Sequence, residues 1–292
     1  MILLTGATGN VGSALLRRLT ADGQRVRCLV RDPRRLGPER VRVQIALGDL
    51  SDPGSFRNAM RGVKTVIHLA AAIRDQPRVS IEELNGVAVY RLVRAAERAG
   101  AERFVFFSVI GASQHAPMRF FRAKALAEQA VEESSVPSTI FAPSIVYSPD
   151  DYWIGLMERL TWLPAVPISG SGQARYQPIW AEDVVDCVMA ALERDGDGAS
   201  RYELAGPETL TYDDVARMVL RSLDRRRRLL HVPLPLVHSG LRAVQAAMGA
   251  ASPVTWDEVQ LMEAAMTSAT GTADAESLGV KPLPMREVLG AR

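Results

Sequence analysis

The stretch Thr5-Gly6-Ala7-Thr8-Gly9-Asn10-Val11-Gly12 decides the fold. It follows an apolar run over residues 1–5 and leads into a helical pattern over residues 11–22. A strand, a glycine turn and a helix start in this order are typical of the phosphate-binding unit of a Rossmann-type sheet. Glycine is needed where the chain turns sharply, where the backbone approaches a pyrophosphate and where the helix packs on the strand. The stretch therefore predicts that the free N–H groups at the helix N-terminus bind the phosphates of a dinucleotide.

The rest of the first half alternates apolar runs with amphipathic stretches, which indicates β-α-β units and a parallel sheet. The expected strands are rich in Val, Ile, Leu or Phe, and they cover residues 1–5, 25–31, 41–47, 64–69, 103–108 and 137–142. The expected helices fill the gaps at residues 11–22, 53–61, 80–99 and 119–134.

The alternation loosens after about Pro149, where prolines and a glycine-serine run interrupt it. Residues 176–180 resemble a strand that returns to the sheet, with a helix following to about residue 194. Beyond them the pattern predicts helices over 212–223, 235–249 and 255–267, and Thr211 with Asp214 forms a capping-box pattern. We predict an α/β protein with a Rossmann-type doubly wound parallel sheet over residues 1–150. Residues 151–292 are expected to form a smaller, mostly helical substrate-binding portion, in which 176–194 returns to the sheet.

Composition excludes several classes of protein. The chain has 292 residues, of which 47% are hydrophobic and 23% charged, as in ordinary globular proteins. A net charge of +2 gives no indication of nucleic acid binding, and no apolar run is long enough to span a bilayer. The two cysteines, Cys28 and Cys187, lie in apolar patterns and have no metal-ligand spacing, which favours a reducing cytoplasm. We expect a cytoplasmic protein without a metal, a monomer or small homo-oligomer that acts on a small molecule.

The end of the second expected strand bears on the choice of cofactor. An acidic residue about 20 positions after the glycines would bind the ribose hydroxyls of NAD, but the chain has Arg31 there. A guanidinium pairs with a 2′-phosphate, and Arg34 and Arg35 lie nearby, so the sequence favours NADP(H) over NAD(H). The neighbouring Asp32 argues in the other direction. Asp49 and Leu50 follow the third expected strand, where a carboxylate and an apolar side chain would hold the adenine.

Several segments together resemble the atypical short-chain dehydrogenase/reductases, particularly the NmrA-like group and the nucleotide-binding accessory subunit of respiratory complex I. The matching stretches cover nearly the whole chain and are residues 5–12, 29–33, 48–50, 66–71, 103–108, 142–147, 177–183 and 278–280. The resemblance implies the fold and a bound nicotinamide dinucleotide. It places Ala70 and Pro143 beside that cofactor, together with Gly6, Thr8, Gly9, Asn10, Val11 and Gly12 of the opening turn.

The family's catalytic set is a serine after the fifth strand and a Tyr-x-x-x-Lys motif on the next helix. Ser108 and Lys124 match the serine and the lysine, whereas Phe120 stands at the tyrosine position. Phenylalanine has no hydroxyl and cannot transfer a proton to a carbonyl. The isoflavone-reductase-like branch also lacks the tyrosine and assigns the acid/base role to lysine, so we expect Lys124 to bind cofactor and to stabilise negative charge on the substrate.

Three residues are candidates for contact with substrate. His115 precedes the Lys124 helix, and Tyr147 and Trp153 follow the sixth expected strand, where aromatic walls suit a flat conjugated molecule. Core packing explains such aromatic residues equally well, and His68 inside an apolar strand indicates a core histidine.

The leading hypothesis is hydride transfer between NADP(H) and a quinone-like, aromatic or conjugated carbonyl compound, including polyketide tailoring by reduction or monooxygenation. A non-catalytic nucleotide sensor or assembly factor is the first alternative, and Phe120 supports it. A nucleotide-sugar epimerase is the second alternative, which residues 143–147 support and Phe120 opposes. Resemblance in fold does not decide among them.

Overall fold

The computed structural model describes residues 1–56, 58–77, 79–194, 200–249 and 254–290. Its centre is a seven-stranded, wholly parallel sheet with strand order β11-β6-β5-β4-β1-β2-β3. The strands are β1 (Ile2–Thr5), β2 (Val26–Val30), β3 (Gln44–Leu47), β4 (Thr65–His68), β5 (Arg103–Phe107), β6 (Ser138–Pro143) and β11 (Ser200–Leu204). The first six agree with the strands expected from the sequence, and the Rossmann-type fold is confirmed. The order reverses between β1 and β4, and ligands of such sheets bind at this switch point.

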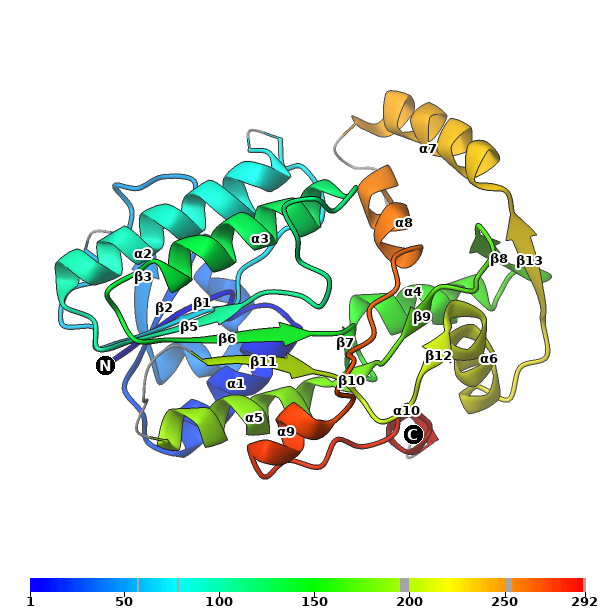
Figure 1. Ribbon diagram of the computed structural model, residues 1–292. Helices are drawn as coiled ribbons and strands as arrows, with labels where there is room; N and C mark the ends of the chain where they lie inside the picture. Colours follow the sequence, from blue (N-terminus) through cyan, green and yellow to red (C-terminus); the bar gives the residue numbers. More distant parts are fainter. Residues whose placement is uncertain (57, 78, 195–199, 250–253, 291–292) are drawn as a thin grey trace.

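Helices cover both faces of the sheet (Figure 1). On one face lie α2 (Ala88–Ala99) and α3 (Arg119–Glu132), and on the other α1 (Asn10–Ala21), α5 (Ala181–Glu193) and the short α9 (Ala273–Ser277). Each face buries its own apolar cluster. α2 shows why these segments are helical: Val89, Leu92, Val93 and Ala96 are buried at helical spacing, and Gly100 ends the helix in the left-handed conformation at φ +66°.

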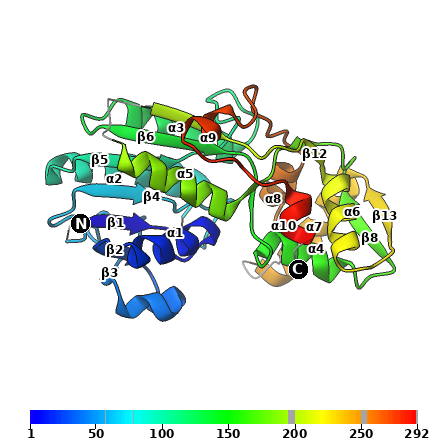
Figure 2. The same cartoon turned by 90° about the horizontal axis from the view of Figure 1, so that it is seen from below.

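A second lobe lies beyond the carboxyl ends of the strands (Figure 2). It has its own apolar cluster, which includes Tyr147, Tyr176 and Val215. Its helices are α4 (Tyr152–Leu160), α6 (Tyr212–Ser222), α7 (Leu234–Met248), α8 (Trp256–Met262) and α10 (Met285–Gly290). Its strands form pairs outside the main sheet: β7 (Val146–Tyr147) with β10 (Ile179–Trp180), β9 (Arg175–Tyr176) with β12 (Leu210–Thr211), and β8 (Ala165–Ser169) with β13 (Arg228–Val232). The expected capping box of Thr211 and Asp214 starts α6.

Two expectations about secondary structure are wrong. Residues 176–180 do not join the main sheet, because they are divided between β9 and β10, each of which pairs within the second lobe. The strand that does join it is β11, which runs parallel to β6. The helix expected over 53–61 is replaced by turns at its described residues, because the Asp52 carboxylate accepts the N–H of Gly54 and the Ser55 hydroxyl donates to the Asp52 carbonyl oxygen. Residue 57 lies outside the described residues.

The C-terminal segment returns to the nucleotide-binding half. Ala275 and Leu278 are buried in the cluster beneath α1 and α5, and a carboxylate oxygen of Asp274 accepts the N–H of Glu203 on the edge strand β11 at 2.7 Å. In the described part of the chain no helix is both long and apolar enough to cross a membrane.

Candidate nucleotide-binding and active site

The glycines after β1 are packed against backbone, which leaves no space for side chains. Gly6 has φ +75°, and a Cβ atom there would lie 2.5 Å from the Ala70 nitrogen. A Cβ atom on Gly12 would lie 2.0 Å from the Gly6 carbonyl oxygen. Both positions therefore require glycine, which holds β1, the start of α1 and the chain after β4 close together.

The N-terminus of α1 has no side-chain cap. Its N-cap residue, Gly9, is extended, and the first-turn N–H groups of the helix are the donors that a phosphate binds. The side chain of Asn10 has other partners: its Oδ1 accepts the Ser148 hydroxyl at 2.6 Å, and its Nδ2 donates to Asp151 at 3.4 Å. Asn10 thus connects the phosphate-binding turn to the loop that begins α4. Val11 is half-buried beside it and packs on the core beneath the sheet.

A cleft of about 670 Å³ opens at these glycines. It is lined by the phosphate-binding turn, by the ends of β2 and β3 and by the chain after β4, and its lining includes Gly6, Thr8, Gly9, Arg31, Arg35, Asp49, Leu50, Ala70, Arg74 and Glu258. A backbone cradle, an uncapped helix start and an elongated cleft across the switch point fit a dinucleotide.

Arginine side chains surround the carboxylate at the end of β2. Asp32 accepts two hydrogen bonds from Arg34, Nε to Oδ1 and Nη2 to Oδ2, both at 3.0 Å. This pairing with Arg34 holds the pKa of Asp32 below its ordinary value. Arg31 and Arg35 line the cleft on either side of it. All three residues line the cleft, and the negative charge of Asp32 is already paired, so Arg31 and Arg35 give this part of the lining a net positive charge.

The turn after β3 is rigid. Asp49 accepts both the N–H and the hydroxyl of Ser51 at 2.9 Å, and its own N–H binds the Ser55 hydroxyl. Leu50 follows it and lines the same end of the cleft. Asp49 and Leu50 thus both line the cleft, and their contact with adenine stays a prediction.

Asn85 shapes the wall after β4. It is fully buried in a single π-helical turn (Glu83–Val87) that runs into α2. Its side chain accepts the N–H of Ala72 and donates to the carbonyl oxygens of Ala72 and Ile81. Asn85 therefore fixes the backbone that lines the cleft beside Ala70, and π-turns are frequent at functional sites.

The sequence did not indicate the residues that close the far end of the cleft. Arg74 pairs with Glu258 of α8 at 3.0 Å, and both residues line the cleft. The Thr255-x-x-Glu258 spacing in the sequence predicts a capping box, and this capping box does begin α8. It contains no information about where α8 packs, so this contact could not be found from the sequence.

Lys124 and Ser108 both lie at the carboxyl end of β5. Ser108 is the residue that follows the strand, and Lys124 reaches the end of the strand from α3. The Lys124 side chain is 2% exposed, and its Nζ donates to the Phe107 carbonyl oxygen at 2.6 Å. Nζ lies 4.9 Å from the ring centre of Phe106 and 5.8 Å from that of Phe120. Burial lowers the pKa of Lys124 to about 7, although the carboxylate of Glu128 acts in the opposite direction. Ser108 is buried, and its hydroxyl has no hydrogen-bond partner in the described structure.

His68 belongs to the same buried layer. Its Nδ1 is hydrogen-bonded to the Thr5 hydroxyl at 2.7 Å, and its ring stacks on Phe106. Burial, aided by the nearby Lys124, lowers the pKa of His68 to about 3. The imidazole is therefore neutral, as expected of a core histidine.

The other candidates lie outside the lining of the cleft. Pro143 is buried at the end of β6, and its carbonyl oxygen accepts the Ile110 N–H. His115 is exposed in the loop before α3. Tyr147 and Trp153 pack in the core of the second lobe. Lys124 and Ser108 are likewise not among the residues that line the cleft.

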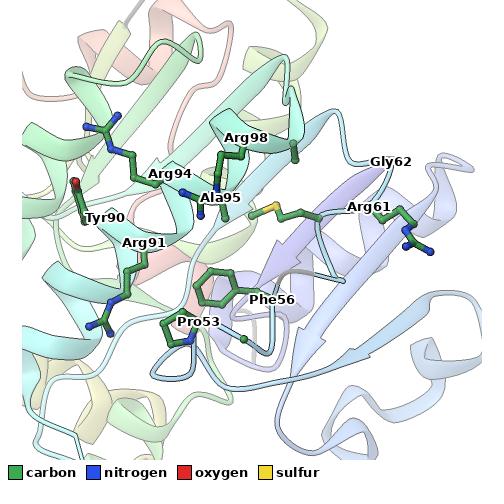
Figure 3. Close-up of a pocket in the computed structure, with 12 residues that line it drawn as sticks. Pro53, Phe56, Arg61, Gly62, Tyr90, Arg91, Arg94, Ala95 and Arg98 are labelled. Atoms are coloured by element: carbon green, nitrogen blue, oxygen red, sulfur yellow. The ribbon is translucent and has the colours of Figure 1, made fainter.

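A larger cavity, of about 720 Å³, lies on the outer side of α2 and shares no residue with the cleft (Figure 3). Its lining includes the buried side chains of Phe56 and Met60 and the arginines at positions 61, 91, 94 and 98. It has neither a glycine cradle nor an uncapped helix start, so we assign the nucleotide to the smaller cleft.

Comparison with known proteins agrees with this geometry. A family model described as NAD(P)H-binding matches residues 6–195. The chain belongs to this NAD(P)H-binding family. Its relatives include complex I subunits and NmrA-like proteins of the atypical short-chain dehydrogenase/reductase type.

Curated relatives of the family have different activities. The chain is 30% identical to a (4-alkanoyl-5-oxo-2,5-dihydrofuran-3-yl)methyl phosphate reductase of Streptomyces griseus, over 90% of this chain and 86% of that protein. It is 27% identical to an NAD(P)H azoreductase of Xenophilus azovorans, over 87% of this chain and 82% of the relative. It is 29% identical to the mitochondrial NADH dehydrogenase 1 alpha subcomplex subunit 9 of Arabidopsis thaliana, over 79% of this chain but only 60% of that subunit.

Solved structures share the fold at lower identity. A UDP-glucose 4-epimerase of Thermus thermophilus, in complex with NAD, superposes with a TM-score of 0.74 at 17% identity, over 99% of this chain and 96% of the epimerase. A dTDP-glucose 4,6-dehydratase of Streptomyces venezuelae gives 0.76 at 18% identity, over 99% and 94%. These similarities concern the fold alone.

Proposed function

We propose that the protein is an NADPH-dependent reductase of a small quinone-like, aromatic or conjugated carbonyl compound. The observation that carries this proposal is the backbone cradle of Gly6 and Gly12 at the mouth of the cleft, with Arg31 and Arg35 at its ribose end. Relatives named as reductases, including an azoreductase, support reduction as the type of reaction.

NADP(H) is favoured over NAD(H) by the charges at the end of β2. A 2′-phosphate beside Arg31 and Arg35 gains charge-assisted hydrogen bonds. Asp32 does not oppose it strongly, because Arg34 pairs with both of its carboxylate oxygens.

When bound, the nicotinamide supplies a hydride to the substrate. The residues of the chain supply position, charge and a proton. The N-terminus of α1 binds the phosphates, and the backbone at Ala72, which Asn85 holds by hydrogen bonds, orients the dinucleotide. Near neutral pH, Lys124 holds an exchangeable proton at Nζ, because its pKa is lowered to about 7. In this proposal the hydride reduces the substrate carbon and the Lys124 proton passes to the oxygen that becomes negatively charged, with Ser108 as the neighbouring polar group. A quinone then becomes a hydroquinone and an enone becomes an enol, and neither product requires a tyrosine.

A non-catalytic nucleotide sensor or assembly factor is the second candidate function. Two observations favour it: Phe120 stands at the tyrosine position, and neither Lys124 nor Ser108 is among the residues that line the cleft. A sensor needs the cradle alone. The nucleotide-sugar epimerase has no such support, since its chemistry needs the hydroxyl that Phe120 lacks.

An NADPH-oxidation assay with quinones and aromatic ketones separates the two candidates. Lys124→Met should lose turnover at least a hundredfold while still binding NADPH measurably by calorimetry, because general acid catalysis contributes about 100- to 10,000-fold. Lys281→Met is the matched control, since Lys281 is an exposed lysine near the C-terminus. Tight NADPH binding without oxidation by any acceptor would assign the protein to the sensor class.

A further inference from the structure

Helix α7 is almost unpartnered in the fold. None of its residues, Leu234 to Met248, is buried, and Figure 1 shows it standing away from the rest of the second lobe. Helix α7 contacts the rest of the protein through the ring of His238, which lies 4.5 Å from the ring of Trp256 of α8, measured between ring centres. Apolar side chains nevertheless recur along it at spacings of three and four residues, at positions 234, 237, 241, 244 and 248. Within this stripe Leu234, Val237 and Leu241 are partly buried, and Val244 and Met248 are 37% and 50% exposed. Leu236, on a neighbouring part of the helix surface, is 64% exposed.

The segment around α7 carries only positive charge. Residues 225–256 contain five arginines, at positions 225–228 and 242, and no aspartate or glutamate. Arg226 and Arg228 make no side-chain hydrogen bond or ion pair with the described residues. Their charges are therefore available to a partner.

Exposed apolar side chains occupy the same end of the molecule. Trp162 is 76% exposed and Leu230, on β13, is 57% exposed. The guanidinium of Arg225 lies 4.0 Å above the Trp162 ring, so the tryptophan and the arginine run are contiguous. Figures 1 and 2 show β8 and β13 at the end of the molecule farthest from the N-terminus, and α7 follows directly from β13.

We define the docking surface as Trp162, Leu230, the arginines at 225–228 and α7. The charge of this surface indicates what kind of partner binds it. A second copy would oppose five arginines to five more, and the apolar stripe of α7 spans only two heptads, too short for a stable coiled coil. A lipid bilayer matches each component: tryptophan favours the membrane interface, arginine binds headgroup phosphates, and an apolar helix face enters the acyl boundary. We propose that this surface docks on an anionic membrane, with α7 lying in the plane of the interface.

Vesicle flotation of the full-length protein tests the proposal. Phosphatidylcholine vesicles containing about one third phosphatidylglycerol should bind the wild-type protein, and pure phosphatidylcholine vesicles should bind it at least tenfold more weakly. The double variant Arg226→Gln/Arg228→Gln should lose about fivefold in partitioning for each arginine removed. The triple variant Leu236→Gln/Val244→Gln/Met248→Gln should lose more than tenfold.

Matched variants elsewhere on the surface serve as controls. Arg61→Gln/Arg98→Gln removes two arginines from the cavity of Figure 3, and Val87→Gln/Leu126→Gln removes two exposed apolar side chains near α2 and α3. Both should bind vesicles as the wild type does, and thermal unfolding checks that every variant is folded. Equal binding by the α7 triple variant and the wild type would overturn the proposal. So would a wild-type dimer that the triple variant converts to a monomer, because the occupant would then be a second copy.

Discussion

The ammonium nitrogen of Lys124 donates to the carbonyl oxygen of Phe107 at 2.6 Å, one residue before the unpartnered hydroxyl of Ser108. This contact fixes a nearly fully buried lysine beneath the carboxyl end of β5. One carbonyl oxygen does not replace the hydration of an ammonium group, so burial lowers the pKa of Lys124 to about 7.

The first prediction concerns stability against pH. An unfolded lysine titrates near 10.5, so between about pH 7 and 10 the unfolded state binds more protons than the folded state. The free energy of unfolding of the wild type should therefore rise, relative to Lys124→Met, by up to about 1.4 kcal/mol per pH unit in this range. Below about pH 7 both states are protonated, and the difference should become constant. Urea unfolding of both proteins across this range measures it, and parallel curves would show that Lys124 is not desolvated.

The second prediction concerns the missing tyrosine. Phe120→Tyr places a phenol hydroxyl four residues before Lys124, one helical turn away on the same face of α3. Reduction of unconjugated ketones should increase at least tenfold in kcat/KM, because their alkoxide product is far more basic than a hydroquinone anion or an enolate and gains most from a second proton donor beside Lys124. Quinone reduction should change less than twofold. Phe121→Tyr, at the adjacent buried position, controls for the added hydroxyl, and an equal gain in that variant would contradict a role for position 120.

The sequence was sufficient for β1, β2, β4, β5 and β6, because a parallel strand buried on both faces must be apolar. The edge strand β3 is mostly exposed and was found from its apolar residues Ile45, Ala46 and Leu47. The sequence was not sufficient for β11, whose residues Ser-Arg-Tyr-Glu-Leu form an edge and are mostly only partly buried. That strand depends on pairing with β6 and on a hydrogen bond to Asp274, more than 70 residues away. The local sequence pattern of β11 gives no information about either its pairing with β6 or its hydrogen bond to Asp274.

The same distinction applies to the site. The contact between Gly6 and Gly12 is local, so the spacing of the glycines predicted it, whereas the contact of Gly6 with Ala70 is between distant parts of the chain. The neutralisation of the Asp32 carboxylate by an ion pair depends on the rotamer of Arg34, and the burial of Lys124 depends on Phe106 and Phe120 packing around it. These are tertiary contacts, which explains why the sequence identified the residues but not their protonation or exposure.

The third prediction tests that pairing of Asp32. Arg34→Ala should free the carboxylate of Asp32 beside the ribose, where it repels a 2′-phosphate and accepts hydrogen bonds from ribose hydroxyls. NADPH affinity should fall about tenfold relative to NADH affinity. Arg42→Ala, which removes an exposed arginine paired with Glu39 instead, is the control. If the ratio of the two dissociation constants does not change, Asp32 does not contact the ribose.

The last prediction compares two helical glycines, one in each half of the protein. Gly12 lies in α1, where an added Cβ would meet the Gly6 carbonyl oxygen at 2.0 Å, whereas Gly155 lies in α4 and a Cβ there meets nothing within 4 Å. Gly155→Ala should stabilise the protein by about 0.5–1 kcal/mol, the usual gain from replacing glycine inside a helix. Gly12→Ala has the same helical gain available but must separate α1 from the turn at Gly6, so it should destabilise the fold and weaken NADPH binding more than tenfold. Chemical unfolding and calorimetry on both variants measure the two effects. A stable Gly12→Ala protein with wild-type affinity would mean that close contact between Gly6 and Gly12 is not what holds the phosphate-binding turn.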